Sequence, residues 1–328
     1  MQQKRKLSLS IFLISSFLIG LGACGSEDTS SPNEDGEAPP VAAEDVREII
    51  HPLGTTVIEG TPERIVTLYQ GATDAANALG IVPVGAVESW EEAPVYEYLR
   101  PELENMAIVG VETQPNVEEI AKLEPDLIVA SHIRHEEIYE QLSQIAPTVV
   151  NETIYDFKES LQLLADATNN EEKAEEILSA WDERVADFQT KIKEKLGDEW
   201  PINAAVLNFR ADHARIYVTG FAGSILQELG FTSSEQQLAL NEDIIMLNDK
   251  ESIPDMNADV FYVFYYDSDP AVQQAFEEWT SHPLWDSLDA VKKDQVYIVD
   301  EVIWNLAGGV QAANLMLDDI YDRFDLEK

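Results

Sequence analysis

Short apolar runs alternate with helical patterns along much of the chain. The runs at 64–68, 81–87 and 126–130 lack a period of two, which is typical of strands buried on both faces. Helical patterns follow at 72–79 and 116–123. Strands that alternate with helices predict an α/β fold with mostly parallel sheets covered on both faces.

The longest helical pattern lies between residues 171 and 196, and a second covers about 307–324. In the first, apolar residues recur every three or four positions, on one face of a helix: Ala174, Ile177, Leu178, Trp181, Val185, Phe188, Ile192 and Leu196. At about 1.5 Å per residue, such a helix is almost ~40 Å long. We expect it to be a rigid strut between two lobes.

The second half of the chain repeats features of the first. Apolar runs at 204–209, 259–265 and 295–299 predict further strands. Residues 118–129 also parallel residues 251–262, with Glu, Ile and Asp at matching places. We therefore expect two similar α/β lobes, with the ligand beyond the carboxyl ends of their strands.

The N-terminal segment has the features of a secretory signal. Three basic residues precede an apolar run at 7–21, and small residues precede Cys24, the only cysteine. The run is about 15 residues long, short of the ~20 that span a bilayer. The segment around Cys24 resembles the lipobox of bacterial lipoproteins, whose cysteine thiol carries a diacylglycerol. The alternative is an ordinary signal peptide followed by an incidental cysteine.

The composition after this signal divides the chain further. Residues 24–45 are rich in Ser, Pro, Glu and Asp without an apolar period, which predicts a disordered tether. The remainder exceeds the usual size of one core. We predict an N-terminal lobe at 46–168, a linking helix at 169–198 and a C-terminal lobe at 199–328.

The charge of the chain is strongly negative. There are 62 acidic and 21 basic residues, a formal net charge of −41, and the expected signal removes three of the basic ones. Such a chain repels nucleic acid and anionic lipid headgroups, so neither is an expected partner. We attribute the acidity to an alkaline or saline habitat.

Five segments carry motifs of a known family: Arg64–Val66, Pro115–Ile120, Leu123–Ile128, Asn208–His213 and Trp304–Gly309. They resemble the periplasmic binding proteins of iron-siderophore and cobalamin uptake. Within that family, they are similar to Gram-positive lipoproteins that bind citrate-derived hydroxamate siderophores such as schizokinen.

This resemblance implies two Rossmann-like lobes joined by one long helix, the class III arrangement of substrate-binding proteins. It implies a monomer without enzymatic activity, anchored by lipid on the extracellular face of the cell membrane. The protein would deliver a ferric siderophore to an ABC permease and its ATPase. Because the siderophore already coordinates the iron, no metal ligand and no cofactor are expected from the protein.

Two arginines are the main candidates for ligand contact. Arg134 follows the strand at 126–130, and Arg210 follows the strand at 204–209 in the other half. Guanidinium groups bind carboxylate oxygens strongly, so together they could clamp an anionic chelate. The alternative is that each pairs with a surface acid such as Glu136 or Asp212, which stabilises a protein by only ~0–1 kcal/mol.

Further candidates lie near the same strand ends. Arg215 and His213 could bind carboxylate oxygens, and the rings of Tyr69, Trp90 and Trp304 could pack on apolar arms of the chelator. The alternative for each aromatic residue is packing within its own lobe.

Three glutamates lie at positions where the family has ligand-binding or permease-docking residues. Some ferric-hydroxamate relatives have an arginine where this chain has Glu112, so that contact is either lost or replaced by Arg134. In the family, one glutamate per lobe docks on arginines of the permease, and Glu118 and Glu251 occupy the corresponding places. The alternative is a favourable interaction of each acid with its helix dipole, worth ~0.3–1 kcal/mol.

Two other functions fit the sequence less well. A receptor for zinc or manganese ions would use His132, His135 and His213, but Arg134 between the first two would repel a dication. A secreted hydrolase would need a nucleophile or metal motif, and no Gly-x-Ser-x-Gly, His-Glu-x-x-His or phosphate-binding loop occurs in the sequence.

Overall fold

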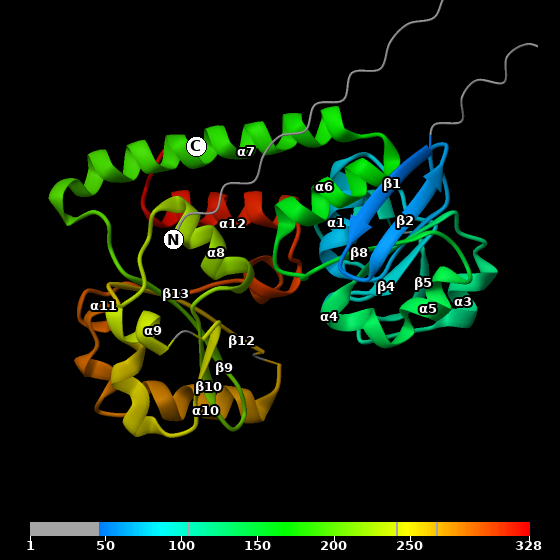
Figure 1. Cartoon of the computed structure of the whole chain (residues 1–328). Helices are drawn as coiled ribbons and strands as arrows, with labels where there is room; N and C mark the ends of the chain where they lie inside the picture. The colour runs from blue at the N-terminus through cyan, green and yellow to red at the C-terminus, as the bar shows by residue number, and fades with distance from the viewer. Residues whose placement is uncertain (1–45, 104, 241, 267) are drawn as a thin grey trace, which may run out of the picture. The chain divides into compact units, whose positions relative to one another are not determined.

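The computed structural model describes residues 46–328 except 104, 241 and 267. These described residues form one compact unit, which Figure 1 shows with its helices and strands labelled. The first residues described form a hairpin, β1 (Val46–His51) and β2 (Gly54–Glu59). The two strands of this hairpin were not predicted from the sequence.

The N-terminal sheet contains six strands in the order β6-β5-β4-β3-β7-β8. All neighbours are parallel except β5 and β6. The strands are β3 (Ile65–Thr67), β4 (Gly85–Glu88), β5 (Ala107–Val111), β6 (Gln114–Pro115), β7 (Leu127–Ser131) and β8 (Thr148–Asn151). The helices of this half are α1 (Gln70–Ala78), α2 (Arg100–Leu103), α3 (Val117–Lys122), α4 (His132–His135), the 3₁₀ helix η1 (Glu136–Ile138), α5 (Tyr139–Ser143) and α6 (Phe157–Thr168).

The C-terminal sheet contains five strands in the order β11-β10-β9-β12-β13. They are β9 (Ala204–Phe209), β10 (Ala214–Tyr217), β11 (Ile244–Leu247), β12 (Val260–Tyr265) and β13 (Val296–Ile298). β9, β12 and β13 are parallel, whereas β10 and β11 are antiparallel to their neighbours. The predicted α/β class with parallel-rich sheets is thus confirmed, and the second sheet departs from it at one edge.

The remaining helices follow α6 in the sequence. They are α7 (Glu171–Leu196), η2 (Gly197–Glu199), α8 (Gly220–Leu229), α9 (Glu235–Leu240), η3 (Lys250–Met256), α10 (Pro270–Thr280), η4 (Trp285–Ser287), α11 (Asp289–Lys292), the π-helical turn η5 (Val302–Leu306) and α12 (Val310–Arg323). The last predicted helix, at about 307–324, corresponds to α12, and the turn η5 that precedes it was not predicted.

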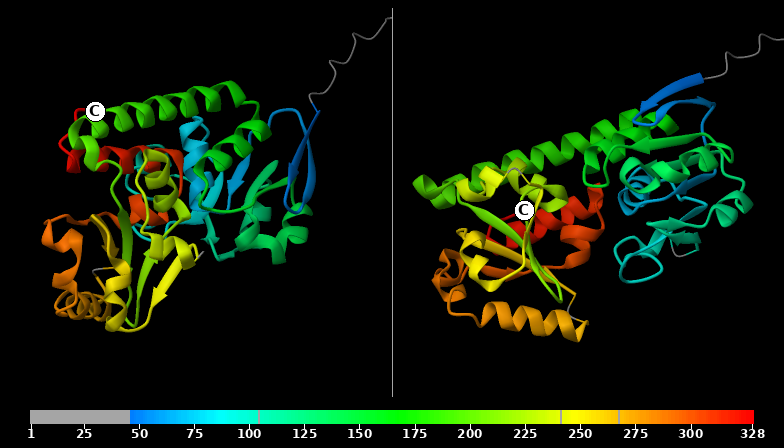
Figure 2. Two further views of the ribbon diagram at one scale, coloured as in Figure 1. Left: turned by 60° about the vertical axis from the view of Figure 1, so that its left-hand side comes forward. Right: turned by 60° about the horizontal axis from the view of Figure 1, so that its bottom comes forward.

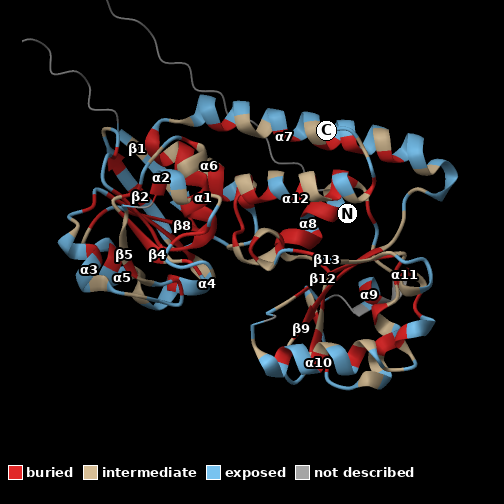
Figure 3. Cartoon of the chain, turned by 180° about the vertical axis from the view of Figure 1, so that it is seen from behind, coloured by how far each residue is buried: buried red, intermediate tan, exposed pale blue. Residues whose placement is uncertain are grey.

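The long helix α7 has the bounds that its apolar period predicts. Its buried residues Trp181, Val185, Phe188 and Ile192 belong to one core cluster with residues of both sheets. Figure 3 shows its buried positions toward α12 and its exposed positions on the outer side. Burying a large side chain such as Phe188 contributes roughly 1.5–3 kcal/mol, so α7 binds both halves to a shared core.

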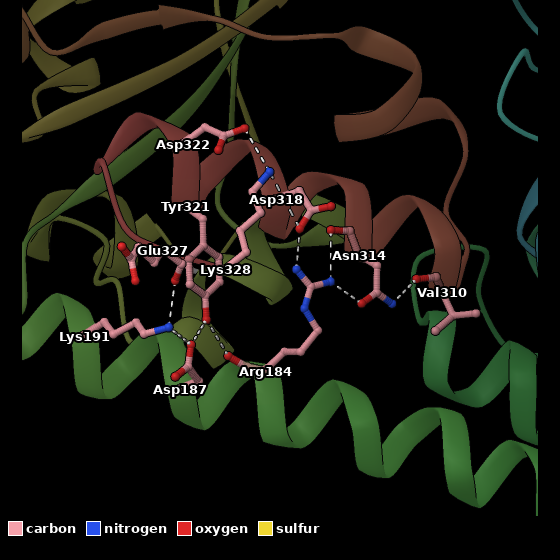
Figure 4. A network of polar contacts seen from close by, with 10 residues as sticks. All are labelled: Arg184, Asp187, Lys191, Val310, Asn314, Asp318, Tyr321, Asp322, Glu327 and Lys328. Carbon is pink, nitrogen blue, oxygen red and sulfur yellow. Dashed lines mark hydrogen bonds and ion pairs between the residues drawn. The ribbon is translucent and has the colours of Figure 1, made fainter.

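Polar contacts also join α7 to α12. The Arg184 guanidinium binds Asn314 and Asp318, and the Tyr321 hydroxyl donates to Asp187 Oδ2 at 2.6 Å. Figure 4 shows this network, and both views of Figure 2 show α7 running alongside α12. The connection between the two halves is therefore both apolar and polar.

Candidate functional site

Arg134 lies in α4, directly after the carboxyl end of β7. Its Nε donates to Glu112 Oε1 at 3.1 Å, and about a third of its side chain (32%) is exposed. Among the described residues, this bond to Nε is the guanidinium's one polar contact. The Nη groups are thus left to bind a ligand while Nε fixes their direction.

Glu112 is the buried partner that orients Arg134. Its side chain is 2% exposed, and its Oε2 accepts a hydrogen bond from the backbone N–H of Gln70 at 3.2 Å. The Trp90 side chain also hydrogen-bonds this carboxyl. Burial raises the pKa of Glu112, and the charge of Arg134 works against that rise. Glu112 therefore supports Arg134 instead of facing a ligand.

His135 connects the start of α4 to the backbone of Glu112. Its Nδ1 accepts from the Ser131 N–H at 3.0 Å, so Nε2 carries the proton that it donates to the Glu112 carbonyl at 2.9 Å. The ring is buried, and burial lowers its pKa to about 4. Because both ring nitrogens are engaged, His135 has none free for a metal ion.

Arg210 lies directly after β9 in the other half. Its Nη1 is 4.0 Å from Glu301 Oε1, and 43% of its side chain is exposed against 9% for Glu301. Burial, followed by the charge of Glu91, raises the pKa of Glu301 to about 7, while Arg210 and the Asn305 amide oppose the rise. Each candidate arginine thus pairs with a buried glutamate, and neither pairs with the surface acid considered from the sequence.

Neighbouring residues of one loop connect these two pairs. Trp90 hydrogen-bonds Glu112 of the first pair, and the next residue, Glu91, is close enough to Glu301 of the second to raise its pKa. Both belong to the segment between β4 and α2. The loop therefore acts on both arginine–glutamate pairs.

His213 is already engaged on both sides of its ring. Its Nδ1 lies 2.6 Å from Asp212 Oδ1, and its Nε2 accepts from Arg215 Nε at 2.8 Å. An accepting Nε2 requires the proton on Nδ1. This corrects the expectation that His213 donates to a ligand carboxylate: the ring instead holds Arg215, whose guanidinium remains a candidate.

The three candidate aromatic residues have different surroundings. Trp90 is 46% exposed, so part of its side chain is available to a ligand. Tyr69 is fully buried and its hydroxyl donates to Ser160 Oγ at 3.2 Å. Trp304 is also buried and stacks on Tyr262 with ring centroids 4.5 Å apart. The expectation is wrong for Tyr69, and Trp304 is a core residue at the wall of a cavity.

That cavity has a volume of about 360 Å³, and Trp304 is the one candidate residue in its wall. It is bordered by the segment between β8 and α6 and by the C-terminal sheet with α8. Asn305, which hydrogen-bonds Glu301, is one of its wall residues. Other wall residues include Tyr155, Lys158, Tyr217, Thr219 and Phe264. A wall with aromatic faces and a few polar groups suits a small-molecule ligand.

Glu118 and Glu251 are both exposed, each in the first turn of its helix. The Asn116 side chain caps α3 by accepting from the N–H of Glu118 and Glu119. Neither carboxylate is needed for the cap, so both remain available to a partner.

The candidate lipid-attachment residue, Cys24, lies outside the described residues. Within residues 46–328, apart from the gaps, no helix combines the length and the apolarity needed to cross a bilayer. The same described residues contain no group of three or more His, Cys, Asp or Glu side chains placed to hold a metal ion.

Sequence reasoning missed Glu301, Asn305 and the tyrosines of the cavity. Glu301 follows the last strand by three residues, the same kind of position that identified Arg210. The chain has 62 acidic residues, and Glu301 stands out among them through its pairing with Arg210, which the sequence does not reveal. Tyr155 and Tyr217 could not be predicted, because they are far apart in the sequence and come to one cavity only in the folded protein.

Comparison with known proteins identifies one family. Residues 65–303 match the family model described as "Periplasmic binding protein". A probable siderophore-binding lipoprotein of Bacillus subtilis is 41% identical over 331 residues, covering 98% of each chain. The achromobactin-binding periplasmic protein of Dickeya dadantii is 45% identical over 260 residues, covering 79% of this chain and 85% of that protein.

A solved structure is similar over most of the fold. The Staphylococcus aureus protein SirA, complexed with staphyloferrin B, is 49% identical, with a TM-score of 0.83. The match covers 86% of this chain and 99% of that one.

Proposed function

Because this chain belongs to the periplasmic binding protein family, we propose that it captures a ferric siderophore and delivers it to the permease of an ABC importer. The names of the similar proteins support this function. The observation that carries it is the pair of guanidiniums, Arg134 and Arg210, each oriented by a buried glutamate and linked through residues 90 and 91.

The ligand that fits this site is an anionic ferric chelate. Its donor atoms already surround the iron, so the protein binds the outer surface of the complex. Arg134 and Arg210 would bind carboxylate oxygens, with Arg215 as a third cation and the exposed face of Trp90 against an apolar arm. We retain the citrate-hydroxamate type as one member of this ligand class. Free zinc and manganese ions are not proposed ligands.

The proposal extends to the location of the protein. Residues 1–23 would be removed as a signal, Cys24 would carry the lipid, and residues 24–45 would tether lobes at 46–168 and 199–328, joined by 169–198. The folded part would then work as a monomer on the outer face of the cell membrane. The relatives named as lipoproteins support such an anchor.

The function is tested by titrating the full chain, purified in detergent, with ferric staphyloferrin B, ferric schizokinen, ferric citrate and ferric desferrioxamine. We expect one of them to quench tryptophan fluorescence with a Kd below about 1 μM. Tight binding of bare zinc or manganese, without a response to any ferric chelate, would contradict the proposal.

The lipid anchor gives a separate prediction. Cys24→Ser is expected to move most of the protein from the membrane fraction to the medium or the soluble fraction, because one thiol carries the whole anchor. Immunoblots of the fractions measure this. An unchanged membrane fraction would show that the chain is held in another way.

Docking on the permease gives a third prediction. In Glu118→Arg with Glu251→Arg, uptake of radioactive iron from the ferric siderophore should fall at least about tenfold, because like charges now face the permease arginines. Binding of the siderophore should stay within about twofold. The control is Glu172→Arg, an exposed charge reversal in the first turn of α7. Equal uptake by the double variant and the control would refute the docking role.

A further inference from the structure

Glu301 differs from the other buried glutamate of the site in its hydrogen bonds. Glu112 uses both carboxyl oxygens, for Arg134 and the Gln70 N–H. Glu301 Oε2 is buried and has no hydrogen-bond partner among the described residues. An unpartnered buried carboxylate oxygen is unfavourable, so this group needs either a proton or a ligand.

The charges around Glu301 are mixed. Arg210 approaches from the end of β9, while Glu91 approaches from the loop after β4 and Asp300 precedes it in sequence. Asn305, one turn later, hydrogen-bonds the carboxyl. Arg210 is the cation that opposes these acids, so any anion that draws Arg210 away leaves Glu301 facing Glu91 and Asp300.

We infer that Glu301 is a specificity residue that couples ligand capture to proton uptake. In the empty site, its carboxylate holds Arg210. When the anionic ferric chelate binds, Arg210 turns to the chelate oxygens, and Glu301 takes one proton from the solvent. The protonated carboxyl can then donate a hydrogen bond to the ligand from its previously unpartnered side. This inference rests on the proposed function.

The direction of the pH dependence follows from the site. In the empty protein, the pKa of Glu301 is about 7, and an adjacent anionic ligand raises it further. Below this pKa, Glu301 is protonated before and after binding, so affinity does not change with pH. Above it, binding must bring in a proton, and affinity falls as the pH rises.

The first test uses the unmodified full chain in detergent with ferric staphyloferrin B. Isothermal titration calorimetry at about pH 8, in two buffers of different ionisation enthalpy, should show uptake of close to one proton per ligand. Affinity should fall about tenfold between about pH 6.5 and 8.5. The absorbance of the free chelate over this range identifies any change in the ligand itself.

The second test compares two isosteric variants. Glu301→Gln mimics the protonated carboxyl and should bind with a nearly constant affinity over the same range, without proton uptake. Asp300→Asn removes an adjacent charge while keeping an acceptor for the Ile303 N–H, and it should retain proton uptake. Tight binding by the unmodified chain without proton uptake would overturn this inference alone. Failure of every ferric chelate to bind would instead overturn the proposed function.

Discussion

Replacing Arg134 and Arg210 together by alanine is expected to weaken binding of the ferric siderophore at least about a hundredfold. In the proposed complex, each guanidinium would make charge-assisted hydrogen bonds to the chelate, worth roughly 1.5–3 kcal/mol each. Loss of one arginine should therefore weaken binding about tenfold or more. The fluorescence titration described above measures both the single and the double variants.

Two controls separate this effect from damage to the fold. Lys122→Ala removes one exposed positive charge, paired with Glu119 on the surface of α3, and should leave the affinity unchanged. Arg134→Ala leaves Glu112 buried without its cation, which is destabilising. The variant Glu112→Gln with Arg134→Gln removes both charges and should show the same loss of binding. Normal affinity in that variant would exclude Arg134 from the site.

The second large effect concerns stability, and it centres on Asp74. This α1 residue is fully buried. Its Oδ1 accepts from the Gln311 N–H at 2.9 Å, and its Oδ2 accepts from the Ala312 N–H at 3.2 Å and from the Tyr98 hydroxyl at 2.7 Å. Asp74 thus caps the N-terminus of α12 from a helix that lies far away in sequence.

The close approach explains the glycine before α12. A Cβ on Gly309 would lie 2.1 Å from Asp74 Cγ, so any larger residue would displace the carboxylate. Asp74→Ala leaves two helix N–H groups and one hydroxyl buried without their acceptor. Since each buried unpaired group costs roughly 1–3 kcal/mol, we expect the free energy of unfolding to fall by about 3 kcal/mol or more.

Asp74→Asn is the matched variant, since its amide oxygen keeps part of the cap. In a denaturant titration, the free energy of unfolding should fall by about half as much in Asp74→Asn as in Asp74→Ala. An effect of either variant below about 0.5 kcal/mol, the usual range for surface substitutions, would show that the cap does not hold α12.

The pH dependence of Asp74 has a definite sign. Burial raises its folded-state pKa to about 6 from an ordinary value of 3.8, although the helix N–H groups oppose the rise. A folded pKa above the unfolded one contributes stability that is complete below about pH 4 and is lost as the pH rises through about 6. The unmodified protein should therefore gain more stability than Asp74→Asn between about pH 7 and pH 5.

The α/β class and the long helix could be predicted because both depend on local apolar patterns. The apolar period predicted the bounds of α7, and the continuous apolar runs predicted most of the parallel strands. The hairpin β1–β2 was missed because its apolar residues do not alternate regularly, and Val46, Ile50 and Val57 are exposed. The four residues of β11 are all apolar, the same pattern that predicted the other strands, so this strand could have been predicted.

The site could be predicted only in part. Arg134 and Arg210 were found because each follows a strand, a property of the sequence. Their partners Glu112 and Glu301 depend on which strands are adjacent in the folded sheets, and that order is not encoded locally. Tyr69 shows the opposite error: its position after β3 suggested exposure, but α6 covers its hydroxyl with Ser160.

The proposed site requires that one arginine from each half contacts the same ferric chelate. This can be seen in a crystal structure of the protein with ferric staphyloferrin B. We expect guanidinium nitrogens of both Arg134 and Arg210 within hydrogen-bonding distance of chelate oxygens, with the Glu301 carboxyl no longer paired to Arg210. A complex in which both arginines keep their glutamate partners and the chelate lies elsewhere would contradict it.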